Sequence, residues 1–148
     1  MRTMDAMRRS GVGVEPGRTI EDAAALMEHT GVGSLAVIDG ERLVGIVTDR
    51  DLVRRALARA LPLDARVDAV MTAPVVTIDA NADLHDAYAR FRTNAVRRLA
   101  VVDGERFVGM LAIDDLLMDL SAELADLIRP VTAETIFAQH DSSVPAAS

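Results

Sequence analysis

The chain has 148 residues, of which 50% are apolar and 26% are charged, and its formal net charge is −7. This composition is that of a folded chain, long enough for one compact domain or for two small halves that share a core. The chain contains neither cysteine nor lysine, which excludes disulfides, cysteine-ligated metal sites, cysteine nucleophiles, Schiff-base lysines and a P-loop lysine.

The strongest pattern is an internal repeat with a shift of 64 residues. A repeat constrains the whole fold, so it is considered before the individual helices and strands. Residues 12–53 align with residues 76–117 without a gap, and 16 of the 42 aligned positions are identical. Most of the differences keep the apolar or polar character, as in Met27 against Phe91. Two copies are too few for a solenoid. The repeat therefore predicts two half-domains packed as a pseudo-two-fold pair.

Each copy begins with a short apolar strand, followed by a helix whose apolar residues recur at positions i, i+3, i+4 and i+7. The expected buried stripes are Ile20, Ala23, Ala24 and Met27 in the first copy and Leu84, Ala87, Tyr88 and Phe91 in the second. Thr19-x-x-Asp22 and Asp83-x-x-Asp86 stand where helix-capping residues belong.

A β-hairpin follows in each copy, because Asp-Gly between two apolar runs is typical of a tight turn that needs a positive φ. A second helix is expected to begin near Asp49 and near Ile113. The expected strands are 12–14, 35–38 and 43–47 in the first copy and 75–78, 99–102 and 107–111 in the second. Each unit is therefore β-α-β-β-α, a mixed α/β fold whose three-stranded sheet is too small to bury its own face.

The boundaries follow from the repeat and from the segments outside it. The expected parts are a first repeat at 3–60, a linker with a short helix at 61–74, a second repeat at 67–118, a C-terminal helix at 119–130 and a partly disordered tail at 131–148. Leu117, Leu120, Leu124 and Leu127 continue a helical stripe up to Pro130, where the helix is expected to end. The last residues are small and polar, which favours a frayed end.

Several local features occur together in an arrangement found in a known family. They are the two Asp-Gly hairpins, the segment Gly45-Ile46-Val47-Thr48-Asp49-Arg50-Asp51-Leu52 and the segment Val96-Arg97-Arg98-Leu99 before the second hairpin. With the doubled β-α-β-β-α unit, they resemble a tandem pair of CBS (cystathionine-β-synthase-type) domains, also called a Bateman module. The likeness covers roughly residues 3–118, so a stand-alone pair is expected.

Thr48 and Asp51 lie three residues apart where a strand passes into a helix, and the N–H groups at such a helix end suit an anion. A hydroxyl there can meet a phosphate, while a carboxylate can accept hydrogen bonds from ribose hydroxyls. In the CBS family Thr/Ser-x-x-Asp binds adenosine ligands, so the resemblance implies this role for Thr48 and Asp51. The spacing is equally that of a capping box, and this alternative stays open.

The resemblance further implies that each site is completed by the other repeat. Thr77, Ile78, Val96 and Arg98 would complete the Thr48/Asp51 site, with Arg98 on the phosphate. A weaker second site would comprise Gly13, Val14, Val32, Ser34 and Asp115. It lacks the hydroxyl because Ala112 stands at the position of Thr48, and it lacks the arginine because Ser34 stands at the position of Arg98.

The expected function is regulatory: the module senses AMP, ADP, ATP or S-adenosylmethionine, with AMP or ADP favoured, and a nucleotide could bring Mg²⁺. The alternative is a ligand-independent dimerisation scaffold with degenerate sites. We expect no enzyme, no required cofactor and no metal, since no catalytic constellation is visible and His29, His85 and His140 lack ligand spacing. A cytoplasmic homodimer is expected, with the C-terminal helix contributing, an unknown protein partner, and no membrane or nucleic-acid binding.

Overall fold

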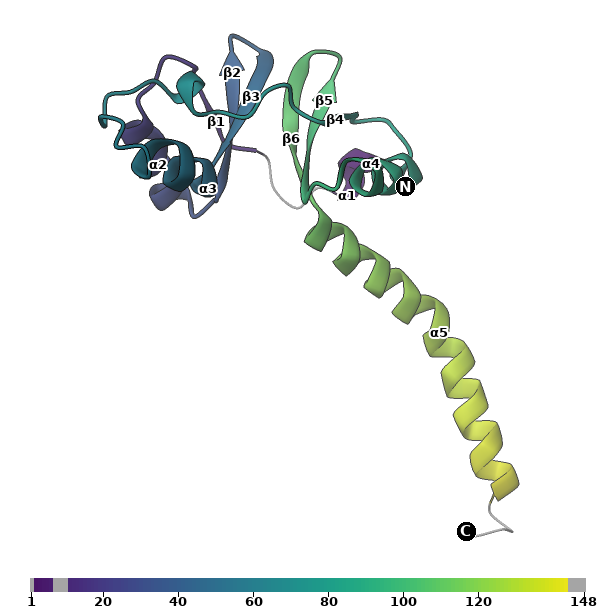
Figure 1. Cartoon of the computed structure of the whole chain (residues 1–148). Coiled ribbons are helices and arrows are strands. Elements are labelled where there is room, and N and C mark those ends of the chain that lie inside the picture. Colours follow the sequence, from purple (N-terminus) through teal and green to yellow (C-terminus); the bar gives the residue numbers. More distant parts are fainter. Residues whose placement is uncertain (1, 7–10, 144–148) are drawn as a thin grey trace. The chain divides into compact units, whose positions relative to one another are not determined.

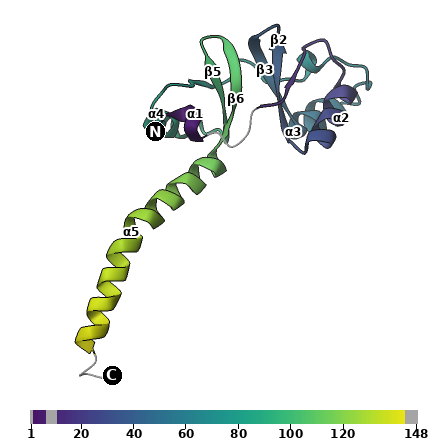
Figure 2. The same ribbon diagram turned by 180° about the vertical axis from the view of Figure 1, so that it is seen from behind.

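The computed structural model describes residues 2–6 and 11–143, with side chains described up to residue 128. It comprises two units, residues 1–113 and 114–148. The first contains a six-stranded sheet to which both repeats contribute (Figures 1 and 2). The elements are α1 (Thr3–Ala6), β1 (Gly13–Val14), α2 (Ile20–Thr30), β2 (Ser34–Asp39), β3 (Arg42–Thr48), α3 (Asp49–Asp51), the π-helical turn η1 (Leu52–Leu57), the 3-10 turn η2 (Val67–Ala69), β4 (Thr77–Asp79), α4 (Leu84–Asn94), β5 (Arg98–Asp103), β6 (Arg106–Ala112) and α5 (Ile113–Ser143).

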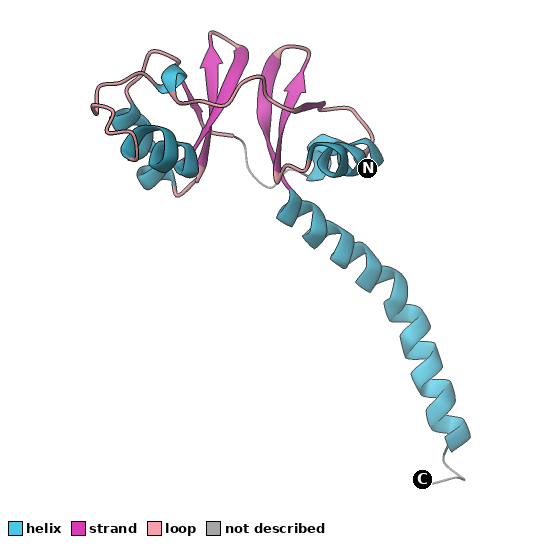
Figure 3. Ribbon diagram, viewed as in Figure 1, coloured by secondary structure: helices cyan, strands magenta, loops and turns pink. Residues whose placement is uncertain are grey.

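The strand order β1-β2-β3-β6-β5-β4 is symmetric about its centre, as a pseudo-two-fold pair requires. In each half the first strand is parallel to the second, and the second is antiparallel to the third. The register repeats with the same shift of 64, since Ser34 pairs with Thr48 and Arg98 pairs with Ala112. The halves join where Arg42 pairs with Arg106. The mixed α/β fold predicted from the repeat is confirmed, and Figure 3 shows its strands and helices.

The expected short strands differ slightly from those observed. β1 is Gly13–Val14 rather than 12–14, and β4 is Thr77–Asp79 rather than 75–78. Both strands pair on one side only, with β2 and with β5 respectively. The ends of both strands are therefore set by the residues of β2 and β5 that can form backbone hydrogen bonds with them. A run of apolar residues in the sequence does not show where this pairing stops.

The helices pack through the predicted apolar stripes, with one exception. Ile20, Ala23 and Met27 are buried, but Ala24 is exposed, so its assignment to the buried stripe is wrong. The buried residues of α2 stand at positions i, i+3 and i+7, which form one narrow stripe along the helix. Ala24, at position i+4, lies outside this stripe. In the second repeat Leu84, Ala87 and Phe91 are buried, and Tyr88 is partly buried.

The segment that precedes the first strand of each repeat completes the opposite repeat. Before β1, the N–H of Thr3 donates to the Ala82 carbonyl at 2.9 Å. At the equivalent position before β4, the N–H of Val67 donates to the Arg18 carbonyl at 2.8 Å. Thr3 and Val67 are both fully buried. Neither repeat is therefore complete without a segment that lies outside its own β-α-β-β-α unit.

Both hairpins turn at glycine, as predicted. Gly40 and Gly104 have φ values of +67° and +66°, a region that strains residues with a Cβ. The helix α5 departs from the expected C-terminal helix, because it continues through Pro130 to Ser143. A proline removes one backbone hydrogen bond but does not prevent helix on its C-terminal side, where Ala133, Glu134 and Ala138 favour it. Of the expected tail, residues 144–148 lie outside the described residues.

Thr19 and Asp83 cap α2 and α4 as predicted. The Asp22 N–H donates to Thr19 Oγ1 at 3.0 Å, and the His85 N–H donates to Asp83 Oδ1 at 2.9 Å. This second hydrogen bond lowers the pKa of the Asp83 carboxyl below its usual range.

The cap at Asp83 should therefore weaken in acid. A carboxyl with a lowered folded-state pKa contributes stability above its unfolded-state pKa, and this contribution is lost as the pH falls through the folded-state value. We expect Asp83→Asn, which keeps a capping oxygen but does not titrate, to show a smaller fall in melting temperature between pH 7 and pH 3. Thermal unfolding followed by circular dichroism measures this, and parallel curves for the two proteins would contradict it.

Candidate nucleotide-binding site

A cavity of about 250 Å³ is lined by residues from both repeats and from the linker between them. Ile46 and Thr48 come from β3, while Arg98 begins β5. The full lining is Ile46, Thr48, Thr72, Pro74, Val75, Val76, Val96, Arg97 and Arg98. Of the predicted site residues, the structure thus brings together Thr48, Val96 and Arg98.

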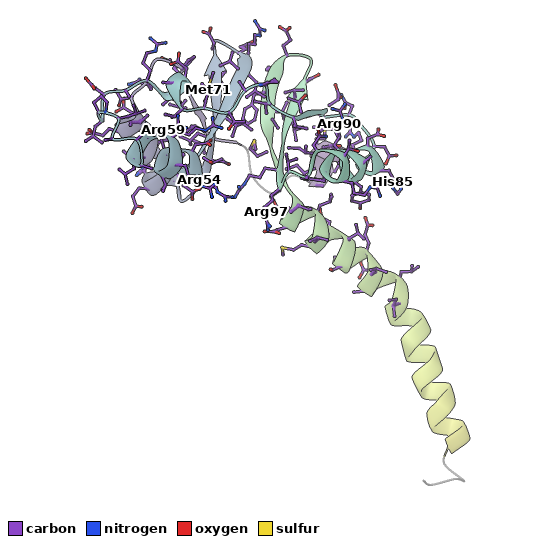
Figure 4. The ribbon with its side chains drawn as sticks, in the orientation of Figure 1. Arg54, Arg59, Met71, His85, Arg90 and Arg97 are labelled. Carbon is purple, nitrogen blue, oxygen red and sulfur yellow. The ribbon has the colours of Figure 1, made fainter. Side chains whose placement is uncertain are left out.

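The linker reaches this position because it pairs with β3. The Ile46 N–H donates to the Thr72 carbonyl at 3.0 Å, and the Thr72 N–H donates to the Ile46 carbonyl at 2.7 Å. Gly45 permits the close approach, since a Cβ there would lie 2.9 Å from Met71 Cγ and 3.2 Å from the Thr72 carbonyl oxygen. Figure 4 labels Met71 in this linker. The pairing brings the residues that follow Thr72 to the cavity.

Thr48 and Asp51 form a reciprocal capping box at the start of α3. The Asp51 N–H donates to Thr48 Oγ1 at 3.0 Å, and the Thr48 N–H donates to Asp51 Oδ2 at 3.0 Å. The capping alternative from the sequence is therefore confirmed. It does not occupy the threonine fully, because a hydroxyl that accepts one hydrogen bond still carries a proton to donate.

The Asp51 carboxylate has further neighbours in the linker and on the turn that follows α3. Its Oδ2 lies 3.5 Å from the Thr72 hydroxyl, and its Oδ1 lies 3.8 Å from Arg55 Nε. Its side chain is 14% exposed and is not among the residues that line the cavity. A ribose contact by Asp51 remains a prediction.

The other predicted residues of this site lie elsewhere. Thr77 lines an adjoining cavity of about 480 Å³, which shares Pro74 and Val75 with the first. Ile78 is buried at 3% exposure. It lines a separate pocket with Asp79 and Ala82, so neither Thr77 nor Ile78 lines the cavity of Thr48 and Arg98.

The weaker second site remains a prediction. Val14 is buried, Gly13 is exposed, and Val32 and Ser34 are partly buried in the first unit. Asp115 belongs to α5 in the second unit. Ala112, at the end of β6, occupies the position equivalent to Thr48, so no hydroxyl is available there.

Sequence reasoning did not assign several lining residues to this cavity. They are Ile46, Thr72, Pro74, Val75, Val76 and Arg97. The signal for Arg97 was present, because it neighbours Arg98 in the motif before the second hairpin. The linker residues had no such signal, since only their pairing with β3 brings them to the site.

The lining suits a ligand with an anionic group and a flat apolar group. Arg98 and Arg97 bring two guanidinium groups, which can each donate parallel hydrogen bonds to a phosphate. Arg97 is labelled in Figure 4. Pro74, Val75 and Val76 supply apolar surface of the kind against which a base packs. A mononucleotide has both features.

Two kinds of site are not found in the described part of the chain. Its histidine, aspartate and glutamate side chains nowhere gather in a group of three that could hold a metal ion. Within the described ranges, every helix is too short or too polar to cross a bilayer.

Comparison with protein families gives two matches to the model of the CBS domain, at residues 4–58 and 67–122. The chain belongs to the CBS domain family. Both matches coincide with the repeats, so the chain is a tandem CBS pair, as the sequence motifs indicated. CBS-domain proteins are generally regulatory, and the matches include no catalytic family.

Similar proteins include chains of comparable length. The chain is 34% identical over 115 residues to the CBS domain-containing protein YhcV of Bacillus subtilis, covering 78% of this chain and 82% of that protein. It is 30% identical over 118 residues to Hypoxic response protein 1 of Mycobacterium tuberculosis, covering 78% and 82%. A solved CBS domain protein from Pyrobaculum aerophilum, complexed with AMP, matches with 27% identity and a TM-score of 0.72, covering 82% of this chain and 99% of that one.

Proposed function

We propose that this CBS pair is a regulatory module that binds an adenosine nucleotide, with AMP or ADP favoured, in the cavity lined by Thr48 and Arg98. The observation that carries the proposal is the cavity itself, which joins a hydroxyl at a helix start to two arginines from the other repeat. The AMP complex of a similar CBS protein supports the class of ligand.

In this proposal the phosphate lies between the Thr48 hydroxyl and the Arg98 guanidinium, and the base packs on Pro74, Val75 and Val76. The volume of about 250 Å³ is slightly below the roughly 300–1,000 Å³ of typical small-molecule sites, which favours one phosphate over three. A nucleotide there would touch both repeats and the linker. Binding would stabilise one arrangement of these parts, which is how a ligand can shift the states of a regulatory module.

The proposal is tested by titrating the purified chain with AMP, ADP, ATP, S-adenosylmethionine and adenosine in a calorimeter. We expect AMP or ADP to bind most tightly, and adenosine to bind at least about tenfold more weakly, because it lacks the group that contacts Arg98. Absence of binding by every one of these compounds at millimolar concentration would contradict the proposal.

One observation favours the scaffold alternative. The Thr48 and Asp51 side chains already satisfy each other's backbone N–H groups, so the motif has a structural role without any ligand. In that case self-association would be the main function. We propose a homodimer to which the C-terminal helix contributes, because Leu117, Leu124 and Leu127 on α5 are exposed.

A further inference from the structure

The two repeats differ at the residue that caps the C-terminus of their first helix. Gly31 caps α2 with a φ of +72° and a ψ of 20°. Ala95 stands at the equivalent position of α4, with a φ of +51° and a ψ of 38°. Both residues are left-handed, but only Ala95 has a Cβ, which crowds the backbone in this conformation. The second repeat thus keeps a backbone conformation that glycine would adopt at lower cost.

Such residues are rare in the part of the chain that the structure describes. Among its residues other than glycine, only Ala60 and Ala95 have a positive φ. Ala60 lies in the turn after η1 and does not line the cavity, whereas Ala95 directly precedes residues 96–98, which do. Backbone strain persists where the surrounding structure holds it, and it is concentrated at functional sites. The place of Ala95 in the chain therefore connects it with the cavity wall.

The strained cap also lies in the repeat that brings the arginine. Three residues after Ala95, Arg98 begins β5 and lines the cavity. Three residues after Gly31, Ser34 begins β2 and has no guanidinium. The unstrained glycine is thus found before the serine, and the strained alanine before the residue to which we assign the phosphate.

The chain on either side of Ala95 is held by hydrogen bonds. Before it, Asn94 Nδ2 donates to the Arg90 carbonyl at 2.9 Å within the last turn of α4. After it, the Ile113 N–H donates to the Arg97 carbonyl at 2.9 Å. The φ and ψ angles of Ala95 lie between these two hydrogen bonds. They therefore set the direction in which the chain leaves α4 toward the cavity.

We infer that Ala95 is a positioning residue of the nucleotide site, an inference that rests on the proposed function. Only a small left-handed region is open to alanine, whereas glycine has a wide range of conformations. Ala95 therefore restricts the paths of residues 96–98 before a nucleotide is bound. A cavity wall with fewer conformations loses less entropy on binding, so the same contacts give a tighter complex.

The test is Ala95→Gly in the full chain, with Ala60→Gly as the matched control. Each removes one Cβ from an exposed, left-handed alanine, so each should raise the melting temperature by about 1–4 °C. Only Ala95→Gly should raise the dissociation constant for AMP, by about two- to fivefold, because only it frees the cavity wall. Circular dichroism measures the melting temperature and calorimetry the affinity. A fold that becomes more stable while AMP binding weakens is not explained by loss of structure.

Two further measurements separate positioning from a general structural role. Ala95→Asn is the conservative variant, because asparagine adopts the left-handed region more readily than other residues with a Cβ. It should keep the dissociation constant for AMP within about twofold of the wild-type value. Backbone amide relaxation measured by NMR reports the restriction without ligand. The order parameters of residues 96–98 should fall in Ala95→Gly and should keep their wild-type values in Ala60→Gly.

The outcomes distinguish this inference from the proposed function. If the wild type binds AMP and Ala95→Gly changes neither the affinity nor the order parameters, the inference is overturned and the nucleotide site stands. An equal loss of affinity in Ala60→Gly, or in Ala95→Asn, would also overturn the inference alone. A wild-type chain that binds no nucleotide would overturn the proposed function together with the inference.

Discussion

Leu99→Ala is expected to lower the free energy of unfolding by about 2–5 kcal/mol, because it leaves a cavity at a fully buried position of the sheet. Leu99 is fully buried in β5 and pairs with Leu111, which is also fully buried. Leu35, its equivalent in β2, is 1% exposed, and Leu35→Ala should cost a similar amount. Urea unfolding followed by far-ultraviolet circular dichroism measures both values.

The matched control is Leu63→Ala, which makes the same chemical change at a side chain that is 60% exposed. It should change the free energy of unfolding by less than about 0.5 kcal/mol. A loss below about 1 kcal/mol for Leu99→Ala would show that this strand does not lie in a packed core.

Arg98→Ala is expected to raise the dissociation constant for AMP by about 10- to 100-fold. A hydrogen bond to a charged group contributes roughly 1.5–3 kcal/mol, and a bidentate pair with phosphate lies at the upper end. Adenosine binding should change by less than about threefold, because adenosine has no phosphate. Calorimetric titration of both ligands separates the loss of the phosphate contact from general damage to the cavity.

Arg106→Ala provides the control, since it removes the same exposed side chain from β6 without altering the cavity lining. It should bind AMP like the wild type. Arg98→Lys should recover only part of the affinity, because an ammonium group lacks the planar pair of donors. Equal AMP affinity in the wild type and Arg98→Ala would contradict the assignment of the phosphate to Arg98.

The sequence was informative about elements whose causes are local. Asp-Gly predicted both hairpins because the turn needs a positive φ, which Gly40 and Gly104 have. Thr19 and Asp83 predicted helix starts because their side chains accept a hydrogen bond from a residue two or three positions along the chain. The capping box of Thr48 and Asp51 was visible for the same reason.

The cavity could be predicted only in part. Thr48, Val96 and Arg98 were identified from the family motif, whereas Thr72, Pro74 and Val75 were missed. Thr72 and the residues that follow it reach the cavity through a bridge between Ile46 and Thr72. A bridge between residues so far apart along the chain depends on the whole sheet, not on the residues nearby.

By itself, the sequence determined the two hairpins and the capped helix starts, because each depends on residues within a few positions of one another. It also determined the duplication and the family, because a repeated order of residue types can be read without knowing the fold. Only the tertiary structure decided that each repeat is completed by the segment before the first strand of the other, through Thr3 in one case and Val67 in the other. It also decided which half of the Thr48/Asp51 motif lines the cavity. The physical reason is that two distant segments pair only where the folded chain brings their backbone donors and acceptors together. The order of residues along the chain does not show where this happens.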